Sequence, residues 1–146
     1  MIGALVRKAR AALDVVAAAV AVARARRTVA NRPVGLLVGK AEEPPYPPDV
    51  STALTALDRQ RGERWGAAVD RALRWIPGDA ACLVRASALR DLVVANGLPR
   101  AAVRIGVRRS ATGFEAHAWV EQDGIPIAEP LALRGAFSSL DGVTLR

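Results

Sequence analysis

The chain has 146 residues, which is enough for one domain with a hydrophobic core. Apolar residues make up 51% and charged residues 24%, so the composition excludes an intrinsically disordered protein. The single cysteine excludes an internal disulfide and fits a reducing, cytoplasmic compartment. With one cysteine and one histidine, a zinc site would depend mostly on carboxylates, so we expect no metal and no cofactor.

The net charge of +7 is concentrated in residues 1–40. This segment holds eight basic residues and one acid, Asp14, while the rest of the chain is neutral. Such a segment favours an acidic protein, a nucleic acid or an anionic membrane surface as its partner, and the alternative is a solvated surface rich in arginine.

Residues 3–30 are rich in alanine, leucine and arginine and contain no proline, which predicts a helix. One face, which we expect to be buried against a neighbour, carries Leu5, Ala9, Ala12, Val16, Val20 and Ala23. The uncharged stretch 15–23 is shorter than the roughly 20 residues needed to cross a bilayer. Asp14 before it and the arginines after it argue against a signal-peptide core.

Residues 41–49, AEEPPYPPD, place four prolines in five positions. This favours an extended, stiff path, and we interpret residues 41–50 as a linker between a basic helical segment, 1–40, and a domain at 51–146. The alternative is a PxxP ligand for another domain.

Two helices are predicted after the linker. Asp49 or Ser51 can cap the first, which runs to about Ile76 and has a core face formed by Leu54, Leu57, Trp65, Val69, Leu73 and Ile76. Asp79 can cap the second, which contains Cys82 and ends at Asn96-Gly97.

Beyond Pro99 the periodicity changes to two residues. The segments AVRIGVRR, FEAHAWVEQ and IPIAEPL read as antiparallel strands, and GVTL near the end is a further strand candidate. Helices followed by a small antiparallel sheet make the predicted fold class α+β.

Cys82 is predicted in the first turn of its helix, where unpaired backbone N–H groups and the positive end of the dipole favour a thiolate. A thiolate beside an imidazole that a carboxylate orients can attack an acyl carbon. The alternative for a lone helical cysteine is a buried, inert side chain.

His117 shares a strand face with Glu115, Trp119 and Glu121. A three-residue loop at Gln122-Asp123-Gly124 would pair His117 directly with Glu129, whereas a two-residue Asp-Gly turn would point Glu129 to the other face. We therefore predict Cys82, His117 and Glu129 as the catalytic residues and exclude Asp123, at the tip of the turn.

An oxyanion hole could use the backbone N–H of Cys82, as helix N-termini commonly do. Trp75 is a weaker candidate donor and is better explained as a core residue.

The segments CLVRASAL and AHAWVEQDGIPIAEP resemble the lasso-peptide leader peptidases, microcin-processing proteins with a transglutaminase-like core. The resemblance covers about residues 78–142 and, more loosely, the basic N-terminus. It implies a papain/transglutaminase fold with Cys82 as nucleophile, His117 as base and then acid, and Glu129 at the acidic position. Two positions depart from the family pattern, because Glu129 stands where aspartate is more familiar and Ala86 where serine is frequent.

The resemblance also implies the reaction and the partners. The reaction is cleavage of one peptide bond between the leader and the core of a ribosomally made precursor peptide. A small leader-recognition protein would deliver the leader, and an enzyme resembling asparagine synthetase would then close the macrolactam ring. No nucleic acid is expected in this role.

Two other functions remain open from the residues. The same chemistry could transfer the acyl group to an amine, as transglutaminases do. A non-enzymatic basic module binding nucleic acid or an acidic protein would explain the charge of residues 1–40 but not the cysteine, histidine and glutamate pattern.

Overall fold

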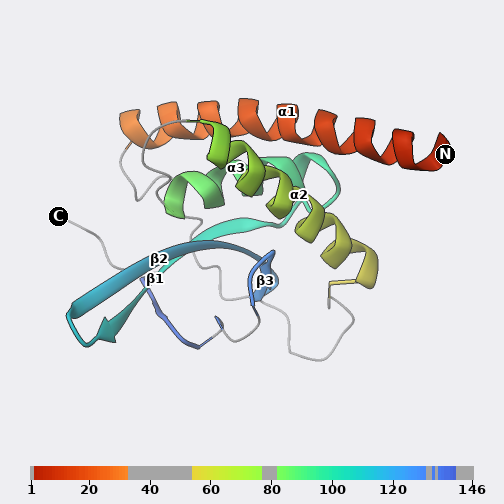
Figure 1. The fold of residues 1–146 in the computed structure, drawn as a ribbon. Helices are drawn as coiled ribbons and strands as arrows, with labels where there is room; N and C mark the ends of the chain where they lie inside the picture. The colour runs from red at the N-terminus through yellow and green to blue at the C-terminus, as the bar shows by residue number, and fades with distance from the viewer. Residues whose placement is uncertain (1, 33–53, 77–81, 131–132, 134, 141–146) are drawn as a thin grey trace.

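The computed structural model describes residues 2–32, 54–76, 82–130, 133 and 135–140. Within them the helices are α1 (Ile2–Asn31), α2 (Ala56–Trp75) and α3 (Cys82–Ala95). The strands are β1 (Ala102–Ser110), β2 (Gly113–Gln122), β3 (Ile125–Ile127) and β4 (Ser138–Ser139), and they form an antiparallel sheet in the order β3-β2-β1-β4. Figure 1 shows the helices gathered on one side of the sheet. The predicted α+β class is confirmed.

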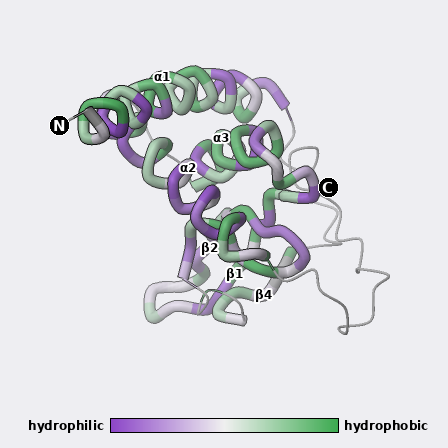
Figure 2. Tube along the Cα trace, turned by 90° about the vertical axis from the view of Figure 1, so that its right-hand side faces the viewer, coloured by the Kyte–Doolittle hydropathy of each residue, from purple (hydrophilic) through white to green (hydrophobic). Residues whose placement is uncertain are grey.

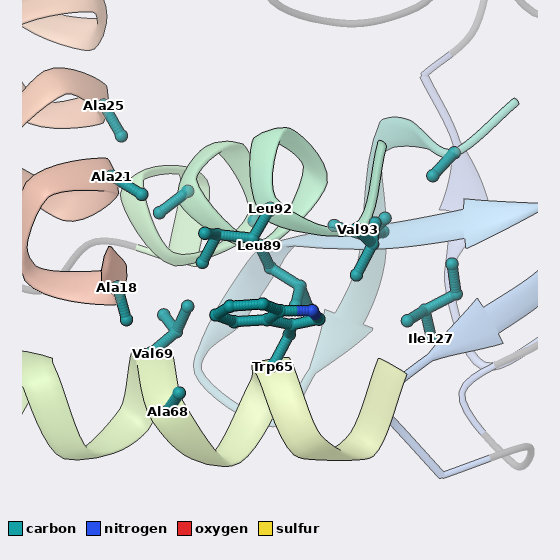
Figure 3. Close-up of a cluster of buried hydrophobic side chains, with 14 of the residues drawn as sticks. Ala18, Ala21, Ala25, Trp65, Ala68, Val69, Leu89, Leu92, Val93 and Ile127 are labelled. Atoms are coloured by element: carbon teal, nitrogen blue, oxygen red, sulfur yellow. The ribbon is translucent and has the colours of Figure 1, made fainter. Parts of the chain in front are cut away.

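The buried face of α1 is not the predicted one. Ala18, Ala21, Val22 and Ala25 are at most 8% exposed, and the labelled alanines of this face point toward α2 and α3 in Figure 3. Leu5 and Val16, from the predicted face, are 72% and 62% exposed. Apolar residues lie on opposite sides of α1, as its hydropathy colouring in Figure 2 shows, so periodicity could not select the buried side. The face that is buried is the one rich in alanine, because small side chains allow close helix packing.

Helix α2 begins at Ala56, later than predicted. Thr55 is the N-cap: its hydroxyl accepts from the Asp58 backbone N–H at 3.1 Å, and the Asp58 carboxylate accepts from the Thr55 backbone N–H at 3.2 Å. The predicted caps, Asp49 and Ser51, lie outside the described residues, as does the 41–50 linker.

The core face predicted for α2 is partly right. Trp65 and Val69 are buried, as expected, whereas Leu57, in the first turn of α2, is 54% exposed.

Helix α3 is the central element of the core. It contacts α1, α2, β1 and β2, and Ala88, Leu89 and Val93 are fully buried. Its predicted end is confirmed: Gly97 adopts a φ of 108°, and the Leu98 N–H donates to the Val93 carbonyl at 2.9 Å. The predicted cap Asp79 lies outside the described residues. None of the described helices combines the length and apolar character needed to cross a bilayer.

The turn between β2 and β3 differs from the prediction. Gln122 pairs with Ile125, so the loop is the two-residue Asp123-Gly124 turn, with left-handed φ values of 53° and 73°. Strand β3 is also shorter than predicted and ends at Ile127, because Ala128 takes a left-handed φ of 54°. The predicted GVTL strand, residues 142–145, lies outside the described part of the chain. Strand β4 pairs with β1.

Glycines bring α2 close to β3. A Cβ at Gly62 would lie 2.5 Å from the Ile127 Cγ2, and one at Gly66 would collide with the Ala128 Cβ. Backbone contact at these two positions sets where the chain leaves β3, and therefore where the next residue, Glu129, is placed.

Candidate active site

Cys82 is the first residue of α3, in agreement with the predicted position at a helix start. Its thiol is free and half-buried, and it packs against the core formed by the helices. Backbone N–H groups of a first helical turn have no partner within the helix, which is the environment that stabilises an anion.

His117 lies on β2 opposite Gly106 of β1. Its imidazole stacks on Trp119 with ring centroids 6.2 Å apart and contacts Phe137 at 5.6 Å. A Cβ at Gly106 would lie 2.7 Å from the Phe137 Cβ and 2.9 Å from the Trp119 Cη2. The glycine therefore makes room for the two aromatic rings that hold the imidazole.

Glu129 lies next to His117, although the turn that predicted this proximity is wrong. The distance between the His117 Nε2 and the Glu129 Oε1 is 3.9 Å. In the observed register a regular continuation of β3 would turn position 129 to the other face of the sheet. The left-handed Ala128 breaks that alternation immediately before Glu129, so the carboxylate reaches the histidine.

Arg85 is the residue that the sequence interpretation missed. Its Nη1 donates to the Glu129 Oε1 at 2.6 Å, and its Nε donates to the Asp70 Oδ1 of α2 at 2.7 Å. Burial by itself would lower the pKa of Arg85, but the hydrogen bonds and charges of Asp70 and Glu129 outweigh it and raise this pKa above the ordinary value. The available signal was the spacing: Arg85 follows Cys82 by three residues, so both lie on one side of α3.

The site is built around one shared oxygen atom. The Glu129 Oε1 faces both the Arg85 guanidinium and the His117 imidazole, and the Glu129 side chain is only 14% exposed. Two carboxylates surround one guanidinium, so the group keeps one negative charge beside the imidazole. Such a charge orients an imidazole and stabilises it once it is protonated.

The thiol and the imidazole approach this group from different sides. Ala118 and Val120 belong to the helix-side core, so the alternation of β2 places His117 and Trp119 on the other face of the sheet. No hydrogen bond joins Cys82 to His117 among the interactions of the described residues. Arg85 and Glu129 connect the two, because Arg85 lies one helical turn from Cys82 and Glu129 contacts both Arg85 and His117.

A groove of about 500 Å³ between α2 and β3 ends at this polar group. Asp70, Arg85 and Glu129 form its polar end, and Leu54 and Ile127 contribute apolar wall. Cys82 and His117 do not line it, so Arg85 and Glu129 separate the groove from the imidazole.

Two further sequence predictions can be placed. Trp75 is 82% exposed at the end of α2, so its interpretation as a core residue is wrong, and its role as an oxyanion donor stays a prediction. Asp123 pairs with Arg100 at 2.8 Å at the tip of the hairpin, as expected for a residue outside the site.

Within the part of the chain that the structure describes, no cluster of three or more histidine, cysteine or acidic side chains could hold a metal ion.

Comparison with known proteins gives one family. Neither the curated proteins nor the solved structures include a match to this chain. A model of the transglutaminase-like superfamily matches residues 4–141, which covers α1 except its first two residues, the other two helices and the sheet. The chain belongs to the transglutaminase-like superfamily.

Proposed function

We propose that this chain is a cysteine peptidase that removes the leader from a lasso-peptide precursor. The superfamily carries cysteine-protease or transglutaminase-type chemistry. The observation that supports peptidase chemistry most directly is the Glu129 carboxylate 3.9 Å from the His117 imidazole, with Cys82 at the start of the helix that also supplies Arg85. The precursor substrate rests on the resemblance of residues 82–89 and 116–130 to leader peptidases.

In the proposed mechanism the Cys82 thiolate attacks the carbonyl carbon of the last leader residue. The new S–C bond gives a tetrahedral intermediate whose oxyanion accepts from the Cys82 backbone N–H. His117 takes the thiol proton and gives it to the departing amine as the C–N bond breaks. It then removes a proton from the water that hydrolyses the acyl-enzyme.

In this proposal the two imidazole nitrogens have separate tasks. Because Nε2 faces Glu129, Nδ1 is the atom available to exchange protons with the thiol. Arg85 acts through Glu129 by fixing the position of the carboxylate, so it is a positioning residue. The proposal requires the thiol and Nδ1 to come within about 3 Å when the substrate is bound. Because His117 faces away from the helices, this requires a movement that brings the start of α3 and the His117 face of β2 together.

The proposal includes two protein partners in the cytoplasm. A small leader-recognition protein would bind the leader and present the scissile bond, and a cyclase resembling asparagine synthetase would receive the released core. Both partners follow from the family resemblance.

The test is to incubate the precursor peptide with the chain, with and without the leader-recognition protein, and to follow the products by mass spectrometry. Cys82→Ala should abolish cleavage and leave leader binding intact. Glu129→Ala should slow cleavage by about 10²–10³-fold, because an unoriented imidazole is a poor proton acceptor.

Asp123→Ala is the matched control, since it removes an acid from the same hairpin that pairs only with Arg100 among the described residues, and it should cleave normally. Full turnover by the Cys82→Ala variant would falsify the peptidase mechanism. Added primary amine distinguishes the alternative: a product whose mass contains the amine in place of water indicates transglutaminase-type transfer.

A further inference from the structure

A cleft rich in arginine separates the N-terminal halves of α1 and α2, on the side of α2 away from the sheet. The two helices diverge toward their N-terminal ends, as Figure 1 shows, and the space between them has a volume of about 680 Å³. Five arginines line it, together with a single acid, Asp14; the arginines are Arg7, Arg10, Arg61, Arg64 and Arg71. We call this the basic cleft.

The charge of the basic cleft is only partly balanced inside the protein. Asp14 is buried and accepts from the Arg64 Nε at 2.6 Å, and this hydrogen bond raises the pKa of Arg64. Arg61 pairs with Asp58 at 3.4 Å. The other three arginines are exposed and make no ion pair within the described part of the chain; they are Arg7, Arg10 and Arg71. An anionic ligand would therefore meet three unbalanced guanidinium groups.

Apolar surface borders the same cleft. Leu57 lines it and is 54% exposed, and small alanines from both helices contribute the wall between the arginines. The matching ligand carries carboxylates together with at least one aliphatic side chain. The volume lies within the range of ligand-binding pockets, about 300–1,000 Å³.

We propose that the basic cleft binds an acidic segment of a partner protein. A concave space between two helices accepts a narrow chain, whereas proteins read duplex DNA with elements that protrude into its grooves. Single-stranded nucleic acid binds by stacking its bases on aromatic side chains, and no aromatic residue is among the described residues that line the cleft. A bilayer surface contacts convex apolar faces rather than a recess of this kind. The proposal does not depend on the function assigned to Cys82.

The test measures binding of a fluorescein-labelled peptide, Glu-Glu-Leu-Glu-Glu-Leu-Glu-Glu, to the full chain by fluorescence anisotropy. The double variant R10E/R71E places two acids in the cleft, one on each helix. The matched control R27E/R74E makes the same charge change on exposed arginines of the same two helices, outside the cleft. At about 50 mM salt we expect R10E/R71E to weaken binding at least about tenfold and the control less than about threefold.

Four outcomes decide the proposal. Equal loss of affinity in both double variants would show a general effect of net charge and would overturn it, as would unchanged binding by R10E/R71E. A 20-base-pair duplex or anionic phospholipid vesicles that bind more tightly than the peptide, and lose affinity only in R10E/R71E, would assign the cleft to another class of partner. Thermal melts followed by circular dichroism check folding, and R10Q/R71Q replaces the charge reversal if that variant melts early.

Discussion

The close packing of Gly66 in α2 against Ala128, the residue after β3, yields a prediction that links packing to the site. In Gly66→Ala the new methyl group would overlap the Ala128 Cβ. Overpacking of this kind costs about 1–3 kcal/mol, and the better helix propensity of alanine returns about 1 kcal/mol. We therefore expect the free energy of unfolding to fall by about 0–2 kcal/mol.

A double-mutant cycle separates the two contributions. Ala128→Gly removes the obstructing methyl group and relieves the left-handed conformation at a φ of 54°, while making the unfolded chain more flexible, so by itself it should be nearly neutral. In the double variant Gly66→Ala/Ala128→Gly the overlap is absent. The coupling free energy should then equal the overpacking cost, about 1–3 kcal/mol.

The assay is urea unfolding followed by circular dichroism at 222 nm. Gly3→Ala is the control, because a Cβ there meets nothing within 4 Å, and it should leave stability unchanged or raise it by up to about 1 kcal/mol. Cleavage by Gly66→Ala should fall as well, since Glu129 follows the displaced residue and a shift of about 1 Å can cost about 100-fold in rate. A coupling energy below about 0.5 kcal/mol would refute the account of how α2 positions Glu129.

Three further changes test other parts of the structure. Thr55→Ala should lower stability by about 1 kcal/mol in thermal melts and Thr55→Ser should restore it, because the hydroxyl caps α2. The hydrogen bond from the same hydroxyl is the main reason that the pKa of Asp58 lies below 3.8. The stability contributed by the ionised Asp58 carboxylate should therefore be present above that pH and be lost as the pH falls further, which an acid titration by circular dichroism measures. Arg85→Met should lower the free energy of unfolding by about 1–3 kcal/mol, because it leaves Glu129 unpaired. The loss should lie toward the lower end, because the other partner, Asp70, has a side chain that is 44% exposed. The variant should also cleave more slowly without binding the leader more weakly. Gly106→Ala should displace the ring of Trp119, visible as a shift in its fluorescence, and reduce cleavage through His117, whereas a variant with wild-type fluorescence and rate would contradict the packing described.

The elements whose ends are marked by glycine, or whose residues alternate between apolar and polar, could be predicted from the sequence. Gly97 ends α3 because only glycine takes its φ of 108° without strain, and the hydrophobic alternation of 114–122 gave β2 to within one residue. The start of α2 was misplaced although its signal was present, since Thr55 and Asp58 stand at the spacing of a capping box. The buried face of α1 could not be chosen because apolar residues occur on opposite sides of this helix.

Glu129 lies beside His117, as predicted, although the predicted register of the hairpin between β2 and β3 is wrong. An Asp-Gly pair between two strands is a strong signal for a two-residue turn, and that turn is observed at Asp123 and Gly124. In an unbroken strand it would have turned Glu129 away from His117. Alanine has no preference for left-handed backbone, so the sequence around Ala128 contains no local sign of the break. Ala128 packs against Gly66, which is distant in the chain, so the break accompanies a contact that exists only in the folded structure.

Arg85 affects both the position of the Glu129 carboxylate and the net charge beside His117. A carboxylate with only an imidazole as its neighbour could move away from it, but the bond of 2.6 Å to Arg85 holds the oxygen in place. A guanidinium alone would also cancel the charge of Glu129. Asp70 prevents that cancellation, because it accepts a second hydrogen bond from the same guanidinium at 2.7 Å and leaves the group with one net negative charge. Under the proposed mechanism, these three residues provide both the fixed carboxylate and the negative charge that proton transfer through His117 requires.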